Sequence, residues 1–188
     1  MTIDAIFEKA KAKISRRDAI AGFAAALAPT VLAASPAMAE ARTSAVQPDD
    51  ERLMREAIAL AAQADYPFGA VITHEGKVLA RGFNDGKTKQ DPTAHGEMVA
   101  IRNFLDAHGP EALKGTTLYT SGEPCAMCMG AIVWCGIGRV VYAASVTELS
   151  QHIGQIQISA AEVAQKTPFA TIEITGGVLA EDALKLFK

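Results

Sequence analysis

Three segments near the middle of the chain alternate between the patterns of β-strands and an α-helix. Residues 116–121 (TTLYTS) indicate a short buried strand, residues 125–135 a helix, and residues 139–144 (RVVYAA) another strand soon after that helix. Strands that alternate with helices favour a domain in which helices cover the faces of a sheet. We therefore expect an α/β fold.

The flanking sequence continues the same alternation. Residues 49–64 open with acids and carry an apolar stripe, which predicts an amphipathic helix. Further predicted elements are a hairpin over 68–84, a polar loop over 85–94, a helix over 95–107, a helix over 159–165, a strand over 169–175 and a last helix over 181–187. The helices that begin at His95 and Cys125 follow loops after strands, where α/β sheets place their sites.

The first forty residues differ in composition from the rest. A basic segment with paired arginines (Arg16 and Arg17) precedes an apolar run over 19–34, and small residues follow at Ala37 and Ala39. This layout predicts an export signal of the twin-arginine type over residues 1–39 and a periplasmic location. A short tether (40–48) and one domain (49–188) would then follow. The alternative is the N-terminal helix of a cytoplasmic protein, and the apolar run is too short for a membrane span.

Charge argues against a nucleic-acid partner. Residues 1–39 hold five basic and three acidic residues, so 13 basic and 18 acidic residues remain, a net charge of −5 on residues 40–188. A polyanion is normally bound by a basic surface, so we expect a small-molecule partner, with tRNA disfavoured.

The stretch EPCAMCMGAIVWC (123–135) contains all three cysteines of the chain. Cys125 and Cys128 lie three residues apart at a helix start, so both sulfurs share one face, where the helix dipole favours thiolates. The pair could be a redox dithiol, half of a structural zinc site or part of a catalytic metal site. Cys135 lies about 10 Å further along the helix axis. We expect it to be a small buried apolar residue.

His95 can supply a third metal ligand beside the cysteine pair, and Glu97 can supply a group that moves protons. A His-x-Glu pair at one helix start and Pro-Cys-x-x-Cys at another form the signature of zinc deaminases. His95, Cys125 and Cys128 would bind one zinc ion per chain and leave its fourth position open for water, as in catalytic sites. The resulting zinc-bound hydroxide would attack an aminated ring carbon, with Glu97 as the proton shuttle.

The chain resembles the cytidine deaminase-like superfamily, and bacterial guanine deaminases most. The resemblance rests on PFGAVI (67–72), DPTAHGE (91–97), LYTSGEPCAMCMGAI (118–132) and GRVVYAA (138–144). It implies a three-layer α/β/α sandwich with a mixed central sheet, and a homodimer in which the C-terminal segment of guanine deaminases crosses to the partner. It also implies that Asn84 holds the ring of the substrate and that Phe68 and Trp134 line the pocket.

The sequence departs from the family at two places. Gly96 replaces the usual Ala between the histidine and the glutamate, which should loosen the helix start slightly. Guanine deaminases have an acidic loop after the strand that ends at residue 144, and here the chain reads SVTELSQHIGQIQIS. Glu148 is the only acid in that stretch, and His152 is a second candidate to contact the substrate.

These features together predict a zinc-dependent hydrolytic deaminase of a free amino-purine base, guanine first, that releases ammonia. Deamination of another small heterocycle, of the cytosine or triazine type, is the next interpretation, followed by tRNA adenosine deamination. A domain of the same fold that only binds its ligand is a further alternative. Glu97 argues against it, because a binding module needs no proton shuttle.

Overall fold

The computed structural model describes residues 42–168 and 171–187, so the predicted export signal lies outside the described residues. The strands form one sheet in the order β1-β6-β5-β4-β2-β3. Their bounds are β1 (Arg42–Thr43), β2 (Gly69–His74), β3 (Lys77–Phe83), β4 (Thr117–Gly122), β5 (Arg139–Ala144) and β6 (Glu173–Thr175). The strand β2 pairs antiparallel with both β3 and β4, and the other three pairings are parallel, so the sheet is mixed, as predicted.

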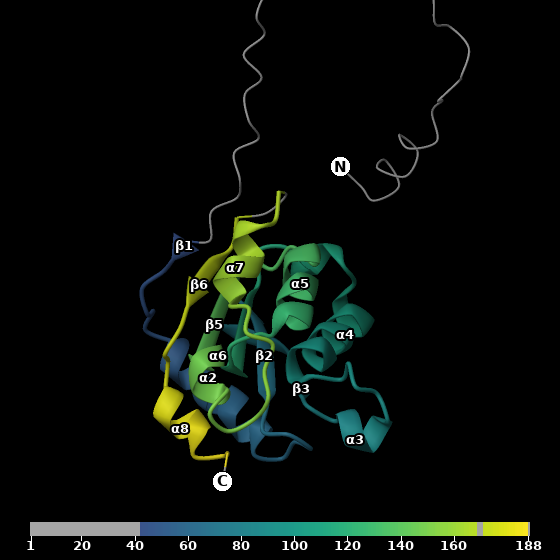
Figure 1. The fold of residues 1–188 in the computed structure, drawn as a ribbon. Helices are drawn as coiled ribbons and strands as arrows, with labels where there is room; N and C mark the ends of the chain where they lie inside the picture. The colour runs from purple at the N-terminus through teal and green to yellow at the C-terminus, as the bar shows by residue number, and fades with distance from the viewer. Residues whose placement is uncertain (1–41, 169–170, 188) are drawn as a thin grey trace, which may run out of the picture. The chain divides into compact units, whose positions relative to one another are not determined.

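Helices cover both faces of this sheet (Figure 1). They are α2 (Asp50–Ala61), α3 (Gly86–Lys89), α4 (Gly96–His108), α5 (Ala126–Trp134), α6 (Val146–Leu149), α7 (Ala160–Gln165) and α8 (Ala180–Leu184), with a 3-10 turn at Glu111–Leu113. Side chains of α4, α5 and α7 pack with Ile72, Leu118 and Val140. Those of α2 and α8 pack with Val71, Tyr119 and Val141 on the opposite face. The expected three-layer α/β/α sandwich is confirmed.

The direction of the strands decides where the helices begin. Both β3 and β4 run antiparallel to β2, so they point the same way and end at the same edge of the sheet. The chain leaves β3 for α4 and leaves β4 for α5, and both helices belong to the same layer. The starts of α4 and α5 therefore meet at the carboxyl edge, the usual place for a site in an α/β sheet.

Three short elements lie where the sequence pattern predicted none. The tether contains β1, which pairs in parallel with β6, and the amide of Ser44 continues that pairing by donating to the carbonyl of Ile174 at 3.0 Å. The loop over 85–94 contains α3, and the stretch after residue 144 begins with α6. The C-terminal helix α8 packs against β4 and β5 of its own chain. No helix within the described ranges is long and apolar enough to cross a membrane.

A buried ion pair joins α2 to the sheet. Asp50 is fully buried, and its two carboxylate oxygens accept hydrogen bonds from Arg139 of β5 at 2.8 and 2.7 Å. The hydroxyl of Tyr119 donates to the same carboxylate at 2.9 Å, and the amide of Gln47 donates at 2.7 Å. Arg139 also donates to Thr175 of β6, so one network joins α2 to three neighbouring strands.

Candidate metal centre and substrate pocket

His95 and Cys125 hold equivalent positions at the starts of two helices. His95 is the N-cap of α4 and Cys125 the N-cap of α5, and both have extended backbones. Cys128 follows in the first turn of α5. Because the two helix starts meet at the carboxyl edge of the sheet, the structure brings these three side chains together from segments thirty residues apart in sequence.

The three donor atoms have the spacing of a zinc ligand set. The Nδ1 atom of His95 lies 3.7 Å from the sulfur of Cys125 and 3.6 Å from that of Cys128, and all three donors lie within 4.8 Å of one another. Tetrahedral zinc with ordinary Zn–N and Zn–S bonds places such donors about 3.6 Å apart. One imidazole and two thiolates leave a coordination position for water. The site therefore fits a catalytic zinc ion, and no second metal cluster was found within the described residues.

The two thiols differ in acidity. A hydrogen bond from Cys128 lowers the pKa of Cys125 to about 4, and His95 adds to the effect. The pKa of Cys128 is raised, first by its interaction with Cys125 and then by burial. The thiolate form is therefore favoured at Cys125 and disfavoured at Cys128. A cation is required to stabilise the second thiolate, because Cys128 is completely buried.

Glu97 lies in the first turn of α4, two residues after the histidine, and is 4% exposed. Burial raises the pKa of its carboxyl group, and the negative charge of Cys125 acts in the same direction. His95 and Cys128 oppose this shift, which shows that the carboxyl group lies beside the ligands. The structure thus places a buried carboxyl group close to the zinc ligands.

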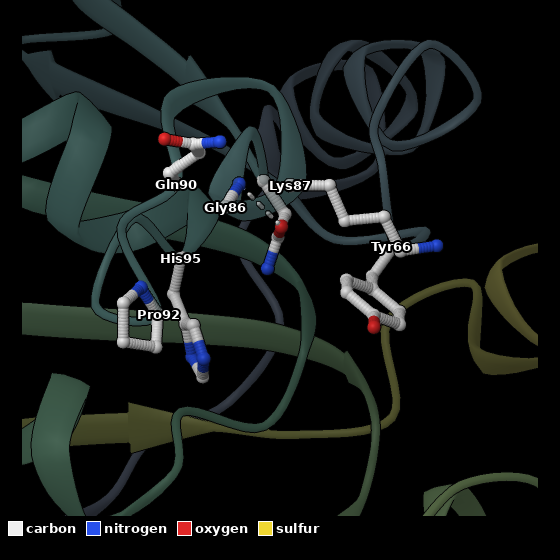
Figure 2. A pocket seen from close by; sticks show the side chains of 7 residues that line it. Tyr66, Gly86, Lys87, Gln90, Pro92 and His95 are labelled. Atoms are coloured by element: carbon white, nitrogen blue, oxygen red, sulfur yellow. Dashed lines mark hydrogen bonds between the residues drawn. The ribbon is translucent and has the colours of Figure 1, made fainter.

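A pocket of about 310 Å³ opens beside His95. Its lining residues are Tyr66, Asn84, Gly86, Lys87, Gln90, Pro92 and His95. Figure 2 shows His95 and Pro92 on one side of the pocket and Tyr66 on the other. The ammonium group of Lys87 lies 4.4 Å from the centre of the Tyr66 ring, so these two side chains form one wall.

Asn84 is held in a fixed orientation at this pocket. Its backbone amide donates to the carbonyl of Phe68 at 2.8 Å, and its side-chain Oδ1 accepts from the amide of Gly86 at 3.1 Å. The Nδ2 group has no hydrogen-bond partner within residues 42–168 and 171–187. Asn84 can therefore offer two N–H donors to a ligand next to His95.

Phe68, whose carbonyl binds the amide of Asn84, belongs to an aromatic cluster. Its ring lies 5.3 Å from that of Phe187 near the C-terminus, and the Phe187 ring lies 5.9 Å from His152. A Cβ atom at Gly122 would approach Phe68 to 2.9 Å and Leu149 of α6 to 3.0 Å. The absence of a side chain at Gly122 therefore lets these two residues converge directly before the Cys125 loop.

The other predicted pocket residues lie elsewhere or have other partners. Trp134 is not among the lining residues of the pocket beside His95. It is 74% exposed and lines a separate surface hollow with Val163 and Lys166. The carboxylate of Glu148 accepts hydrogen bonds from the amide and hydroxyl of Ser145, which form the capping box of α6. Cys135 packs against the core and lies outside the ligand cluster.

Gly96 has a packing role that the sequence pattern did not indicate. A Cβ atom there would come within 2.9 Å of the Phe68 carbonyl oxygen and 3.2 Å of the Cα atom of Gly69. The start of α4 is thus pressed against the strand that follows Phe68. This close approach favours glycine at this position.

Five further residues of the pocket wall were not predicted from the sequence: Tyr66, Gly86, Lys87, Gln90 and Pro92. A signal was available for the last four, because residues 85–94 connect two recognised site residues, Asn84 and His95. For Tyr66 there was none. It precedes β2 and reaches the pocket only because the amide of the adjacent Asp65 pairs with the carbonyl of Asn84 at 2.8 Å.

The site defines a class of protein: a hydrolase with a His-Cys-Cys zinc centre, a buried carboxylate and an adjoining pocket. Residues 47–144, just over half of the chain, match the family described as the cytidine and deoxycytidylate deaminase zinc-binding region. The chain belongs to this family of zinc-dependent nucleobase and nucleoside deaminases.

Relatives with different substrates resemble the chain. Guanine deaminase of Bacillus subtilis (strain 168) is 42% identical over 106 residues, 54% of this chain and 68% of that protein. The tRNA-specific adenosine deaminase of Haemophilus influenzae is 36% identical over 138 residues, 71% of this chain and 78% of that protein. A solved structure from a study of A-to-I editing by tRNA:A34 deaminases has a TM-score of 0.63 and 31% identity, and covers 72% of this chain and 98% of that one.

Proposed function

We propose that the protein hydrolyses the exocyclic amino group of a free amino-purine base, guanine in the first place, and releases ammonia. The observation that carries the proposal is Asn84, whose amide group is fixed by Gly86 and has its N–H donors available beside His95. A purine ring presents acceptor nitrogens to such donors. The similarity to a guanine deaminase over 54% of the chain supports the same substrate.

The residues divide the work as follows. His95, Cys125 and Cys128 hold the zinc ion, which when bound activates a water molecule for attack on the aminated ring carbon. Glu97 would take a proton from that water and pass it to the ring nitrogen. It would then take the second proton, from the hydroxyl group that the attack leaves on the ring carbon, and pass it to the departing amine, which leaves as ammonia. Its burial suits this role, because a carboxyl group shielded from solvent exchanges protons with its neighbours and not with bulk water.

A second candidate is the deamination of adenosine in tRNA. The tRNA-specific adenosine deaminase of Haemophilus influenzae matches 71% of the chain, compared with 54% for the guanine deaminase of Bacillus subtilis. Lys87 and Lys89 lie on α3 beside the pocket, although Lys89 pairs with Asp85 at 2.7 Å. The net charge of −5 on residues 40–188 favours the free base, because RNA binding usually needs a basic surface.

An ammonia-release screen over guanine, adenine, cytosine, their nucleosides, triazines and tRNA tests the proposal. Guanine should be the best substrate. Glu97→Gln should lower its turnover by about 10²- to 10⁴-fold while zinc content stays at one ion per chain. Glu162→Gln, which alters an exposed carboxylate far along the chain, is the matched control and should retain parental turnover. Release from tRNA alone would establish the second candidate instead, and parental turnover by Glu97→Gln would exclude Glu97 as the shuttle.

A further inference from the structure

Glu123 connects three separate segments through one buried carboxylate. It is 8% exposed and immediately precedes the Pro124–Cys125 turn that carries the first cysteine ligand. Its Oε2 atom accepts from the amide of Val146 at 2.8 Å, and its Oε1 atom accepts from the amide of Ala160 at 2.8 Å. Val146 is the first residue of α6, and Ala160 is the first residue of α7.

The carboxylate of Glu123 binds backbone amides at the starts of α6 and α7 that would otherwise lack a partner. Amide groups in the first turn of a helix have no partner within the helix. Ser145 and Ser159 form capping boxes that bind the amides of Glu148 and Glu162 and leave those of Val146 and Ala160. Glu123 accepts the first amide of each helix, and charge-assisted bonds of this kind are stronger than neutral ones. One side chain therefore fixes both ends of residues 146–160.

Residues 146–160 reach the substrate pocket through packing. Leu149 of α6 and Phe68 both lie against Gly122, and Phe68 packs on the hydrophobic cluster that contains Leu149. The Phe68 carbonyl in turn accepts the amide of Asn84, which lines the pocket. The same segment carries His152, whose ring lies 5.9 Å from Phe187 in the aromatic cluster around Phe68.

The carboxylate does not touch the metal centre directly. Both of its oxygens bond to Val146 and Ala160, and within the described residues neither bonds to a zinc ligand. We infer that Glu123 is a positioning residue that fixes residues 146–160 against the ligand loop and thereby sets the affinity and selectivity of the pocket. This inference rests on the proposed function, because it concerns which ring the pocket accepts.

The test replaces Glu123 by Gln, which has the same shape but turns an N–H group toward one of the two amides. In Glu123→Gln, zinc should stay at one ion per chain and KM for guanine should rise about tenfold, with kcat within about threefold. The ratio of kcat/KM between guanine and adenine should fall. Amide exchange at Val146 and Ala160, measured without substrate, should be about tenfold faster than in the parent.

Glu162→Gln is the matched control, because it alters the cap of α7 without a link to the ligand loop. It should leave KM and selectivity unchanged, and the same KM shift in this control would overturn the inference. A fall in kcat at constant KM, or loss of zinc, in Glu123→Gln would overturn it as well.

Amide exchange also separates this inference from the proposed function. If the parent deaminates no free base, the proposed function fails, whereas exchange at Val146 and Ala160 still decides the role of Glu123. Parental amides that exchange as fast as those of an unstructured peptide would overturn the inference, even if Glu123→Gln did not fold. Slow parental exchange that the substitution accelerates would support it.

Discussion

The buried pair of Asp50 and Arg139 gives the sharpest prediction about stability. Asp50→Asn keeps the volume of the side chain and removes its charge. The guanidinium group of Arg139, 6% exposed, would then remain among buried groups without an ionised partner. In the substituted protein one of the two Arg139 hydrogen bonds, now at 2.7 and 2.8 Å, would face an N–H group.

The size of the effect follows from this geometry. Removing one partner of a buried, hydrogen-bonded ion pair costs about 3–5 kcal/mol, since the remaining charge has lost its compensation. We expect a loss in this range for Asp50→Asn. With a typical urea dependence, the midpoint of unfolding should fall by roughly 2 M.

Urea denaturation followed by circular dichroism measures this loss, and the neighbouring residue supplies the control. Glu51 pairs with Arg55 at 2.8 Å, but both side chains are 60% exposed. Exposed pairs contribute about 0.3–0.5 kcal/mol at this helix spacing, so Glu51→Gln should be nearly neutral. A loss below about 1 kcal/mol for Asp50→Asn, or one equal to that of Glu51→Gln, would refute the view that the charge of Asp50 is required.

Three further predictions concern the pocket, the start of α4 and pH. Asn84→Ala should lower kcat/KM for guanine by about 10- to 100-fold and leave zinc content unchanged. Equal losses of kcat/KM and of zinc content would indicate that Asn84→Ala misfolds. Gly96→Ala should destabilise the protein in urea, although alanine favours a helix by about 1 kcal/mol, because its Cβ would meet the Phe68 carbonyl. If Gly96→Ala instead stabilised the protein, the Phe68 carbonyl would be able to move away from the new Cβ atom at little cost in free energy. Although burial tends to raise the pKa of Asp50, hydrogen bonds from Arg139, Gln47 and Tyr119 hold it below its ordinary value of 3.8. The stabilisation it provides is therefore complete above about pH 4 and lost as the pH falls through the lower folded-state pKa. Stability–pH curves of the parent and Asp50→Asn should converge in acid, and a constant gap down to pH 2 would contradict this assignment.

The metal centre could be predicted from the sequence because its chemistry is local. His95 and Glu97 share one helix start, and Cys125 and Cys128 share another. Each pair therefore has a spacing that can be recognised without knowing the fold. Distance along the helix explains why Trp134 does not line the pocket beside His95. It lies nine residues beyond Cys125, about 13 Å along the axis of α5, too far to line a pocket at the helix start.

The long helices and the hairpin followed their hydrophobic patterns, whereas the shortest elements did not. The predicted helix over 49–64 corresponds to α2, and the hairpin over 68–84 to β2 and β3. A helix of four residues such as α6 completes barely one turn and shows no periodicity, and the two residues of β1 are a strand only because β6 lies beside them. Elements of this size depend on tertiary contacts.

The short helices α6 and α7 also carry contacts that the sequence could not reveal, namely the hydrogen bonds to Glu123. Glu123 reads as an ordinary acid before a proline, and nothing within a few positions of it indicates a partner. Its hydrogen bonds reach residues 23 and 37 positions away, so they exist only once β4 and β5 have paired and brought α6 and α7 to the ligand loop. The metal ligands and Glu97 thus lie in two short motifs, whereas the segment that we infer to set substrate selectivity is held by contacts between distant parts of the chain. Substitutions at Glu123 should for this reason change which ring is accepted before they change whether zinc is held.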